Sequence, residues 1–152
     1  MRGEDPGEGK DGEERKIEIL VVDDHEVVRQ GLRLLVAGEP DMAVAGEAAS
    51  GKEMLRRIRE RAWDVIVLDI TLPDCCGLDL LEEIRAERPG MPVVIMSMHS
   101  TAEYADEAMA RGAAGFVAKE DAAAEVIEAM RTVVGGGRYV SGSPPGGGER
   151  RC

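Results

Sequence analysis

The chain has 152 residues, of which 43% are hydrophobic and 3% aromatic, so it is long enough for one domain with an aliphatic core. Its formal net charge of −11 argues against direct nucleic-acid binding, because the chain offers no basic patch for a phosphate backbone. No apolar run approaches the roughly 20 residues that a membrane-spanning helix needs, and the N-terminus does not resemble a secretory signal. We therefore expect a cytoplasmic protein with no membrane contact.

Three segments differ in composition along the chain. Residues 1–15 are rich in Gly and acidic residues and have no apolar face, so we expect them to be disordered. Residues 16–135 alternate apolar runs with helical patterns and form the predicted folded domain. Residues 136–152 are rich in Gly and Pro, which predicts a flexible linker or tail.

Short apolar runs within the folded domain predict strands, and the segments between them have helical periodicity. The predicted strands are residues 17–22, 42–48, 65–69, 92–96 and 114–118. The predicted helices are residues 25–37, a helix opened by a capping box at Ser50 and Glu53, and residues 77–88, 101–111 and 121–134. Continuous apolar strands joined by helical crossovers are typical of a parallel sheet covered on both faces. We therefore predict an α/β sandwich with a five-stranded parallel sheet.

Polar residues stand at the carboxyl ends of most of these strands. They are Asp23 and Asp24 after the first strand, Asp69 at the end of the third, Ser97 after the fourth and Lys119 after the fifth. The carboxyl ends of parallel strands share one edge of the sheet, where ligands bind in such folds. Any one of the Asp residues alone could cap a helix or form an Asx-turn. The whole set predicts a functional site at this edge.

Three carboxylates at one edge repel one another. At 4 Å and an effective dielectric constant near 20, a like-charged pair costs on the order of 4 kcal/mol. A cation or a proton must offset this cost, and oxygen ligands with open positions suit Mg²⁺, which binds one or two carboxylates together with a phosphate oxygen. Lys119 would add a fixed positive charge opposite the metal. Such groups are suited to in-line transfer of a phosphoryl group to an aspartate oxygen.

The motifs resemble those of the receiver domains of two-component response regulators over about residues 17–135. They are VVDDH, VIVLDITLPDCCGLDLL with Pro73 and Gly77, PVVIMSMHS and ARGAAGFVAKE, in the order of that family. The stretch SMHSTAEYADEAMARGAAGFVAK is most similar to the LuxR/NarL-type branch, whose members usually carry a C-terminal helix-turn-helix. The resemblance implies a flavodoxin-like (βα)5 three-layer sandwich with strand order 2-1-3-4-5, which is established for members of this fold.

The resemblance also implies the roles of the acidic residues. Asp69 would be the phosphoacceptor. Mg²⁺ would bind to Asp24, to Asp69 and to the backbone carbonyl of Thr71, and Asp23 would act through a bound water. No small-molecule cofactor is implied.

Other matching residues would sense the phosphoryl group. Ser97 would hydrogen-bond to it, Lys119 would pair with it, and Phe116 matches the aromatic switch position, with an ordinary core residue as the alternative. Phe116 would move inward as Ser97 vacates space, and the surface of the fourth helix, fifth strand and fifth helix would change. Thr71 and His99 would tune the lifetime of the phosphorylated state, unless they are merely solvent-facing loop residues.

The expected function is transfer of a phosphoryl group from a partner sensor histidine kinase to Asp69. The chain would not be an enzyme beyond catalysing its own phosphorylation and dephosphorylation, and a second copy is a candidate partner after phosphorylation. No helix-turn-helix follows residue 140, so we expect a receiver fragment of a longer transcription regulator, whose missing domain would bind DNA, or a stand-alone receiver.

Three other functions fit the sequence less well. A small aspartate-nucleophile phosphatase of the haloacid-dehalogenase type would need an Asp where Thr71 stands, and its nucleophile would follow the first strand. A degenerate receiver that serves only as a scaffold would have lost the acidic pair, the phosphoacceptor or the lysine, and all are present here. A flavodoxin that binds FMN would need a hydroxyl- and Gly-rich loop after the first strand, where DDHE stands.

Overall fold

The structure is a computed structural model of the chain, and it describes residues 16–98 and 102–141. The strands are β1 (Ile17–Val22), β2 (Met42–Ala48), β3 (Val65–Asp69), β4 (Val93–Ser97), β5 (Gly115–Ala118) and β6 (Tyr139–Val140). The helices are α2 (Glu26–Ala37), α3 (Gly51–Glu60), α4 (Gly77–Glu87), α5 (Ala102–Ala110) and α6 (Ala122–Val134), with a 3₁₀ turn, η1 (Lys119–Asp121), before α6. All strand pairs are parallel, in the order β2-β1-β3-β4-β5-β6.

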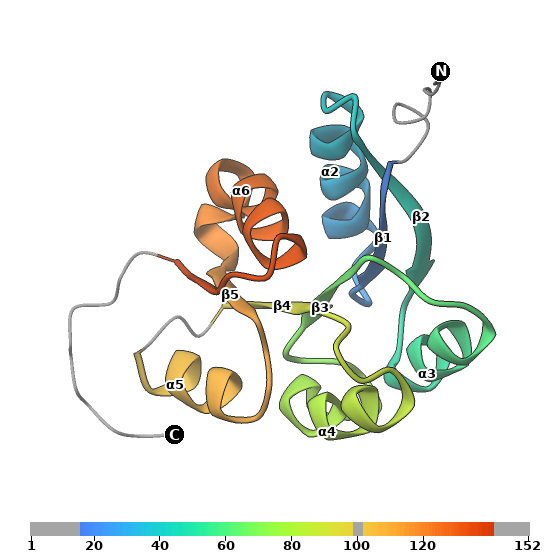
Figure 1. Cartoon of the computed structure of the whole chain (residues 1–152), viewed down its shortest axis with the longest axis vertical. Helices are drawn as coiled ribbons and strands as arrows, with labels where there is room; N and C mark the ends of the chain where they lie inside the picture. Colours follow the sequence, from blue (N-terminus) through green and yellow to red (C-terminus); the bar gives the residue numbers. More distant parts are fainter. Residues whose placement is uncertain (1–15, 99–101, 142–152) are drawn as a thin grey trace, which may run out of the picture.

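Helices cover both faces of the sheet, with α2 and α6 on one side and α3, α4 and α5 on the other (Figure 1). Consecutive residues of β1 point to opposite faces, so Ile19 and Val21 join the core under α2 and α6. Leu20 and Val22 join the core under the other three helices. Because both faces are buried from Ile19 to Val22, all four of these positions are apolar, whereas Glu18 lies in the less buried first part of the strand.

The sheet has one strand more than predicted. β6 extends the edge beside β5, with Tyr139 opposite Gly115 and Val140 opposite Phe116, in the segment predicted to be a linker or tail. The N–H of Ser141 continues this pairing by donating to the carbonyl of Phe116 at 2.8 Å. The predicted number of five strands is therefore wrong, although the order of the first five is as predicted. A two-residue strand has no apolar run to reveal it, and here it pairs with the part of the β5 edge formed by Gly115 and Phe116.

The first turn of α3 is fixed from two directions. The hydroxyl of Ser50 accepts a hydrogen bond from the N–H of Glu53 at 3.1 Å, as the capping box predicts. Asp74, in the loop after β3, accepts hydrogen bonds from the N–H groups of Gly51 at 2.9 Å and Lys52 at 3.1 Å. These bonds lower the pKa of Asp74. The loop that follows Asp69 is thereby anchored to a neighbouring helix.

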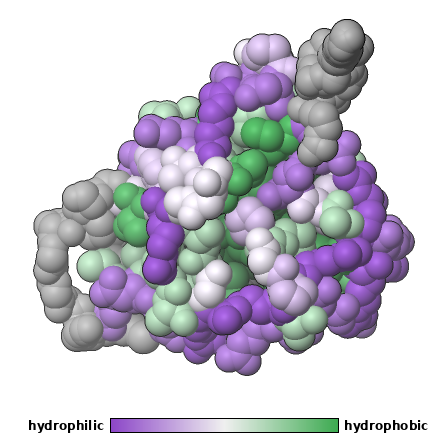
Figure 2. Space-filling view, viewed as in Figure 1, coloured by the Kyte–Doolittle hydropathy of each residue, from purple (hydrophilic) through white to green (hydrophobic). Residues whose placement is uncertain are grey.

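The surface agrees with this layered arrangement. On the face shown in Figure 2, hydrophilic side chains cover the periphery and apolar residues gather toward the middle. Among the described helices, none combines the length and the hydropathy that a bilayer span requires.

Candidate functional site

The three acidic residues predicted to share a site lie together at the carboxyl edge of the sheet. Side-chain atoms of Asp23, Asp24, His25 and Asp69 that could bind a metal all lie within 4.8 Å of one another. Asp23 and Asp69 are 2% and 3% exposed, whereas Asp24 and His25 are exposed. The cluster is therefore closed toward the protein and open toward solvent. Carboxylate oxygens with one open side are the donor set that Mg²⁺ prefers.

Strand register explains why these side chains meet. β1 lies between β2 and β3, with Val22 opposite both Ala48 and Leu68, so the residues that follow Val22 and Leu68 are neighbours. The N–H of Asp23 donates to the carbonyl of Ala48 at 3.0 Å, which continues the β1–β2 pairing by one residue. The next residue along each central strand is an aspartate, and the two carboxylates share one pocket.

Lys119 bridges the two buried carboxylates. Its ammonium nitrogen lies 3.0 Å from Oδ2 of Asp23 and 3.3 Å from Oδ2 of Asp69, and its side chain is 12% exposed. Burial alone lowers the pKa of Lys119, but the bonds and charges of the two carboxylates outweigh it and raise that pKa. The lysine thus stays charged and offsets part of the repulsion between the aspartates.

The surroundings of Asp69 disfavour the charged form of its carboxyl group. Burial raises the pKa of its carboxyl group, and the charge of Asp23 raises it further. The N–H of Thr71, which donates to Oδ1 of Asp69 at 3.2 Å, and the ammonium of Lys119 act in the opposite direction. Because the net shift is upward, the surroundings of Asp69 favour its uncharged form relative to water.

The remaining predicted residues lie at different depths. Ser97 is fully buried at the end of β4, one residue beyond Met96, the register partner of Asp69, and it pairs with Ala118 beside the lysine. Phe116 is 2% exposed in the core under α3, α4 and α5, so the ring already occupies an inward position. The side chain of Thr71 is exposed. His99 lies outside the described residues.

The sequence analysis assigned no role to two residues that contact the acidic pair. His25 follows that pair directly, and its Nδ1 lies 3.1 Å from Oδ1 of Asp23 and 3.2 Å from Oδ1 of Asp24. Arg29, one helical turn further on, reaches back to the carbonyl of Asp23. The adjacency in VVDDH could have indicated His25. The Arg29 contact crosses from a helix to a loop, and helical periodicity does not reveal it.

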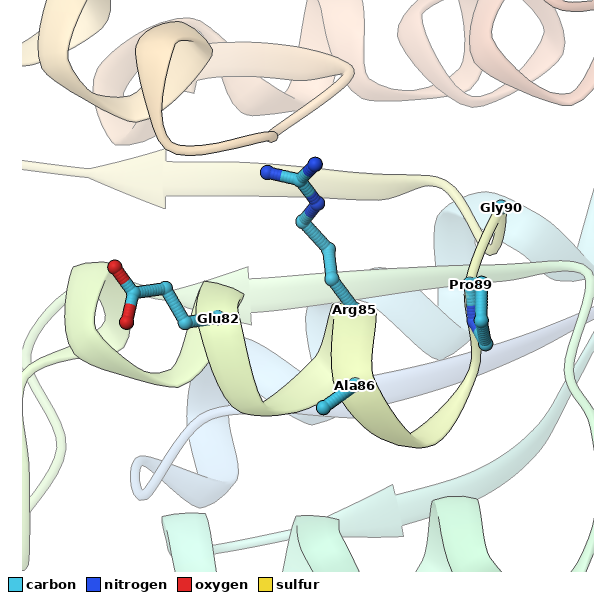
Figure 3. A pocket seen from close by; sticks show the side chains of 5 residues that line it. All are labelled: Glu82, Arg85, Ala86, Pro89 and Gly90. Carbon is cyan, nitrogen blue, oxygen red and sulfur yellow. The ribbon is translucent and has the colours of Figure 1, made fainter.

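Hollows at the opposite end of the sheet do not resemble this site. One of about 450 Å³ is lined by residues 82, 85, 86, 89 and 90, at the end of α4 and in the loop before β4 (Figure 3). Its labelled side chains do not converge on a point: Arg85 and Ala86 point away from the helix in different directions. By contrast, the side chains at the carboxyl edge of the sheet lie close enough to act together, with Lys119 paired to Asp23 and Asp69.

Comparison with known proteins decides the family. The family model described as the response regulator receiver domain matches residues 19–131. The chain belongs to this family. The transcriptional regulatory protein MctR of Rhizobium johnstonii is 36% identical over 129 residues, which are 85% of this chain and 60% of MctR. The transcriptional regulatory protein UhpA of Salmonella typhimurium is 36% identical over 125 residues, which are 82% of this chain and 62% of UhpA.

Solved receiver domains have the same fold. The crystal structure of a LuxR-family two-component response regulator from Aurantimonas is 35% identical, with a TM-score of 0.78 over 82% of this chain and 89% of that one. The signal receiver domain of NarL from Mycobacterium tuberculosis is 29% identical, with a TM-score of 0.74 over 80% of this chain and 98% of that one. The chain is therefore a response regulator receiver domain of the LuxR/NarL type, and it spans only about 60% of MctR and 62% of UhpA.

Proposed function

We propose that this receiver domain accepts a phosphoryl group on Asp69 from a partner histidine kinase in a Mg²⁺-dependent reaction. The observation that carries the proposal is the buried Asp69 carboxylate with Lys119 at 3.3 Å and the acidic pair beside it. Lys119 offsets part of the negative charge of this carboxylate, and a phosphodonor can approach it from the side that is open to solvent.

The chemical step uses one oxygen of Asp69 as the nucleophile. This oxygen forms a bond to phosphorus while the bond from phosphorus to the donor's imidazole nitrogen breaks. The electron pair of the broken bond stays on the imidazole, which takes up a proton, and the product is a mixed carboxylic–phosphoric anhydride. Mg²⁺, when bound, neutralises charge on the carboxylates and on the phosphoryl oxygens.

Exposure and contact support the proposed roles of the metal ligands. Asp24 is exposed at the mouth of the site, where an ion from solvent could reach its carboxylate together with Asp69 and the backbone carbonyl of Thr71. Asp23 is buried and already pairs with Lys119, which favours its action through a bound water. These assignments are consistent with the all-oxygen donor set.

The switch would depend on Lys119 and Ser97. Phosphorylation adds a charge of about −1.5 to −2 and three strong acceptors at Asp69. Lys119 would exchange its carboxylate partners for these oxygens, and Ser97, at the end of the neighbouring strand, would hydrogen-bond to them. Such contacts would shift an existing equilibrium of the surface formed by α5, β5 and α6, with Phe116 of β5 buried on the side of the sheet that α5 covers. Thr71 and His99 would set how readily water attacks the anhydride.

An apolar hollow beside the site supports docking of the kinase. It has a volume of about 500 Å³ and lies between α2 and the start of α6, lined by residues 28, 31, 32, 35, 96, 98, 119, 120, 122 and 123. Because Lys119 lines both this hollow and the phosphorylation site, a partner bound there would lie next to Asp69.

Transcriptional control would pass to an output domain in a longer protein, whereas a stand-alone receiver would act through its partners.

The test is uptake of phosphate by the purified chain. Incubation with a small phosphodonor such as acetyl phosphate should add the mass of one phosphoryl group in the presence of Mg²⁺ and none in EDTA. Asp69→Asn should abolish uptake, and Asp79→Asn, an exposed aspartate on α4, is the matched control and should not. If the unaltered chain takes up no phosphate with Mg²⁺, it acts as a scaffold; turnover of a phosphomonoester would instead indicate a phosphatase.

A further inference from the structure

We infer that Arg29 is a positioning residue that orients the acidic pair for metal binding through the main chain of Asp23. The inference rests on the proposed function, since it assigns a second layer of support to the same site. Arg29 touches neither the phosphoacceptor nor the reacting atoms, so its effect must pass through the loop that carries Asp23 and Asp24.

The guanidinium of Arg29 joins three parts of the fold. Its Nη1 donates to the carbonyl oxygen of Asp23 at 2.5 Å, its Nε to Glu47 of β2 at 2.9 Å, and its Nη2 to Glu26 of its own helix at 2.6 Å. The side chain is 14% exposed. The rigid fork of a guanidinium holds all three acceptors in a fixed relation, which a single ammonium cannot do.

The carbonyl of Asp23 belongs to the peptide unit that joins the two acidic residues. The N–H of Asp23 is already fixed by the carbonyl of Ala48, so the bond from Arg29 fixes the other side of the residue. The peptide plane between Asp23 and Asp24 then has a set orientation, and the exposed Asp24 starts from a defined backbone position. The N–H of His25 restrains the next peptide unit by donating to Oδ1 of Asp23 at 2.9 Å. Without Arg29 the Asp23 carbonyl would lose its own restraint, and the position of Asp24 would have to be ordered further when the ion binds.

Glu47 is the anchor of the arrangement. Burial alone raises the pKa of Glu47, but hydrogen bonds from Arg33 and Arg29 outweigh it and lower that pKa. The carboxylate therefore stays charged at neutral pH and holds the guanidinium of Arg29 beside the β1–α2 loop. Arg29 therefore connects the β1–α2 loop, through the Asp23 carbonyl, to Glu47 on β2.

Arg33 provides a matched control on the same helix. It also pairs with Glu47 and with Glu26, the latter at 3.3 Å, but its hydrogen bonds in the described structure do not include Asp23. Arg33→Met and Arg29→Met therefore remove the same charge and the same two ion-pair partners. Only Arg29→Met removes the bond to the Asp23 carbonyl.

The experiment is isothermal titration of Mg²⁺ into the whole chain, its Arg29→Met, Arg29→Lys and Arg33→Met variants, followed by phosphorylation rates across a range of Mg²⁺ concentrations. We expect Arg29→Met to weaken Mg²⁺ binding on the order of tenfold, with most of the rate recovered at saturating Mg²⁺. Arg33→Met should change the affinity less than about twofold, and Arg29→Lys, which keeps the charge and one donor, should be intermediate.

Two results would overturn the inference: equal Mg²⁺ affinities of the Arg29→Met and Arg33→Met variants, or a rate defect that saturating Mg²⁺ does not correct. If Arg29→Met does not fold, the Arg29→Lys variant and its affinity relative to Arg33→Met decide the question. Failure of the unaltered chain to take up phosphate would refute the proposed function, and the Mg²⁺ titrations would still test Arg29.

Discussion

Replacing the phosphoacceptor by its neutral isostere should stabilise the folded domain in the absence of metal. Asp69→Asn removes a buried charge whose neighbours are two other carboxylates and one ammonium group. Because one oxygen of each of the three carboxylates lies within 4.8 Å of the others, each of the two repulsions on Asp69 amounts to at least about 3.5 kcal/mol at an effective dielectric constant of 20. The attraction to Lys119 at 3.3 Å amounts to about 5 kcal/mol on the same basis. Burial, the largest cause of the raised pKa of Asp69, also disfavours its charge, and the repulsions exceed the attraction. We therefore expect Asp69→Asn to raise the free energy of unfolding by about 2 kcal/mol.

The pH dependence of this difference has a defined sign. Because the folded state raises the pKa of Asp69, the folded chain binds more protons than the unfolded chain at pH values between the unfolded and folded pKa. The stability of the unaltered protein therefore rises as the pH falls through the raised pKa. The variant lacks this group, so its advantage should shrink on acidification.

The assay is urea denaturation in EDTA at neutral pH and at several lower pH values, with Asp79→Asn as the surface control. Saturating Mg²⁺ should narrow the gap at neutral pH, because an ion that binds only the folded state stabilises the protein that holds it more tightly. An Asp69→Asn protein that is no more stable than the unaltered chain in EDTA would refute the electrostatic reasoning. So would an advantage that grows as the pH falls.

Two further changes test the surroundings of Asp69. Lys119→Met leaves Asp23 and Asp69 without their ammonium partner, so we expect a loss of roughly 3 kcal/mol in EDTA, measured by urea denaturation and partly restored by Mg²⁺. Gly77→Ala would place a Cβ 2.6 Å from the carbonyl oxygen of Asp69, so it should slow phosphate uptake and lower the melting temperature. Gly31→Ala, where a Cβ would meet nothing within 4 Å, should instead raise stability by about 0.5–1 kcal/mol; equal effects of the two glycine changes would contradict the close approach at Gly77.

The sequence predicted which residues lie together wherever the position of a residue on a strand determines its neighbours. Asp23 and Asp69 end adjacent parallel strands, and register alone brings their carboxylates together. Lys119 and Ser97 follow the same rule, because the strands that carry them pair at Ala118. The apolar run of β1, residues 19–22, likewise has one physical cause, burial on both faces.

Two features that the sequence did not reveal are the Arg29 contact, which depends on side-chain conformation, and β6, whose local sequence signal is weak. The contact of Arg29 with the Asp23 carbonyl requires a particular rotamer and the carboxylate of Glu47 on another strand. β6 lies among glycines and consists of two residues, so it depends on the free edge of β5 more than on its own composition. Such contacts are set by tertiary context, which periodicity and spacing do not carry.

The position of Lys119 links metal binding to phosphorylation. In the structure its ammonium group serves Asp23 and Asp69 together. If the proposed switch moves this group onto the phosphoryl oxygens, Asp23 keeps its buried charge but loses its nearest cation, and a buried carboxylate in that state is costly. A second cation bound beside Asp23 would then stabilise the folded domain more than it does before phosphorylation. Because coupling between two bound species is reciprocal, the phosphorylated domain should hold Mg²⁺ more tightly to the same extent that Mg²⁺ favours the phosphorylated form.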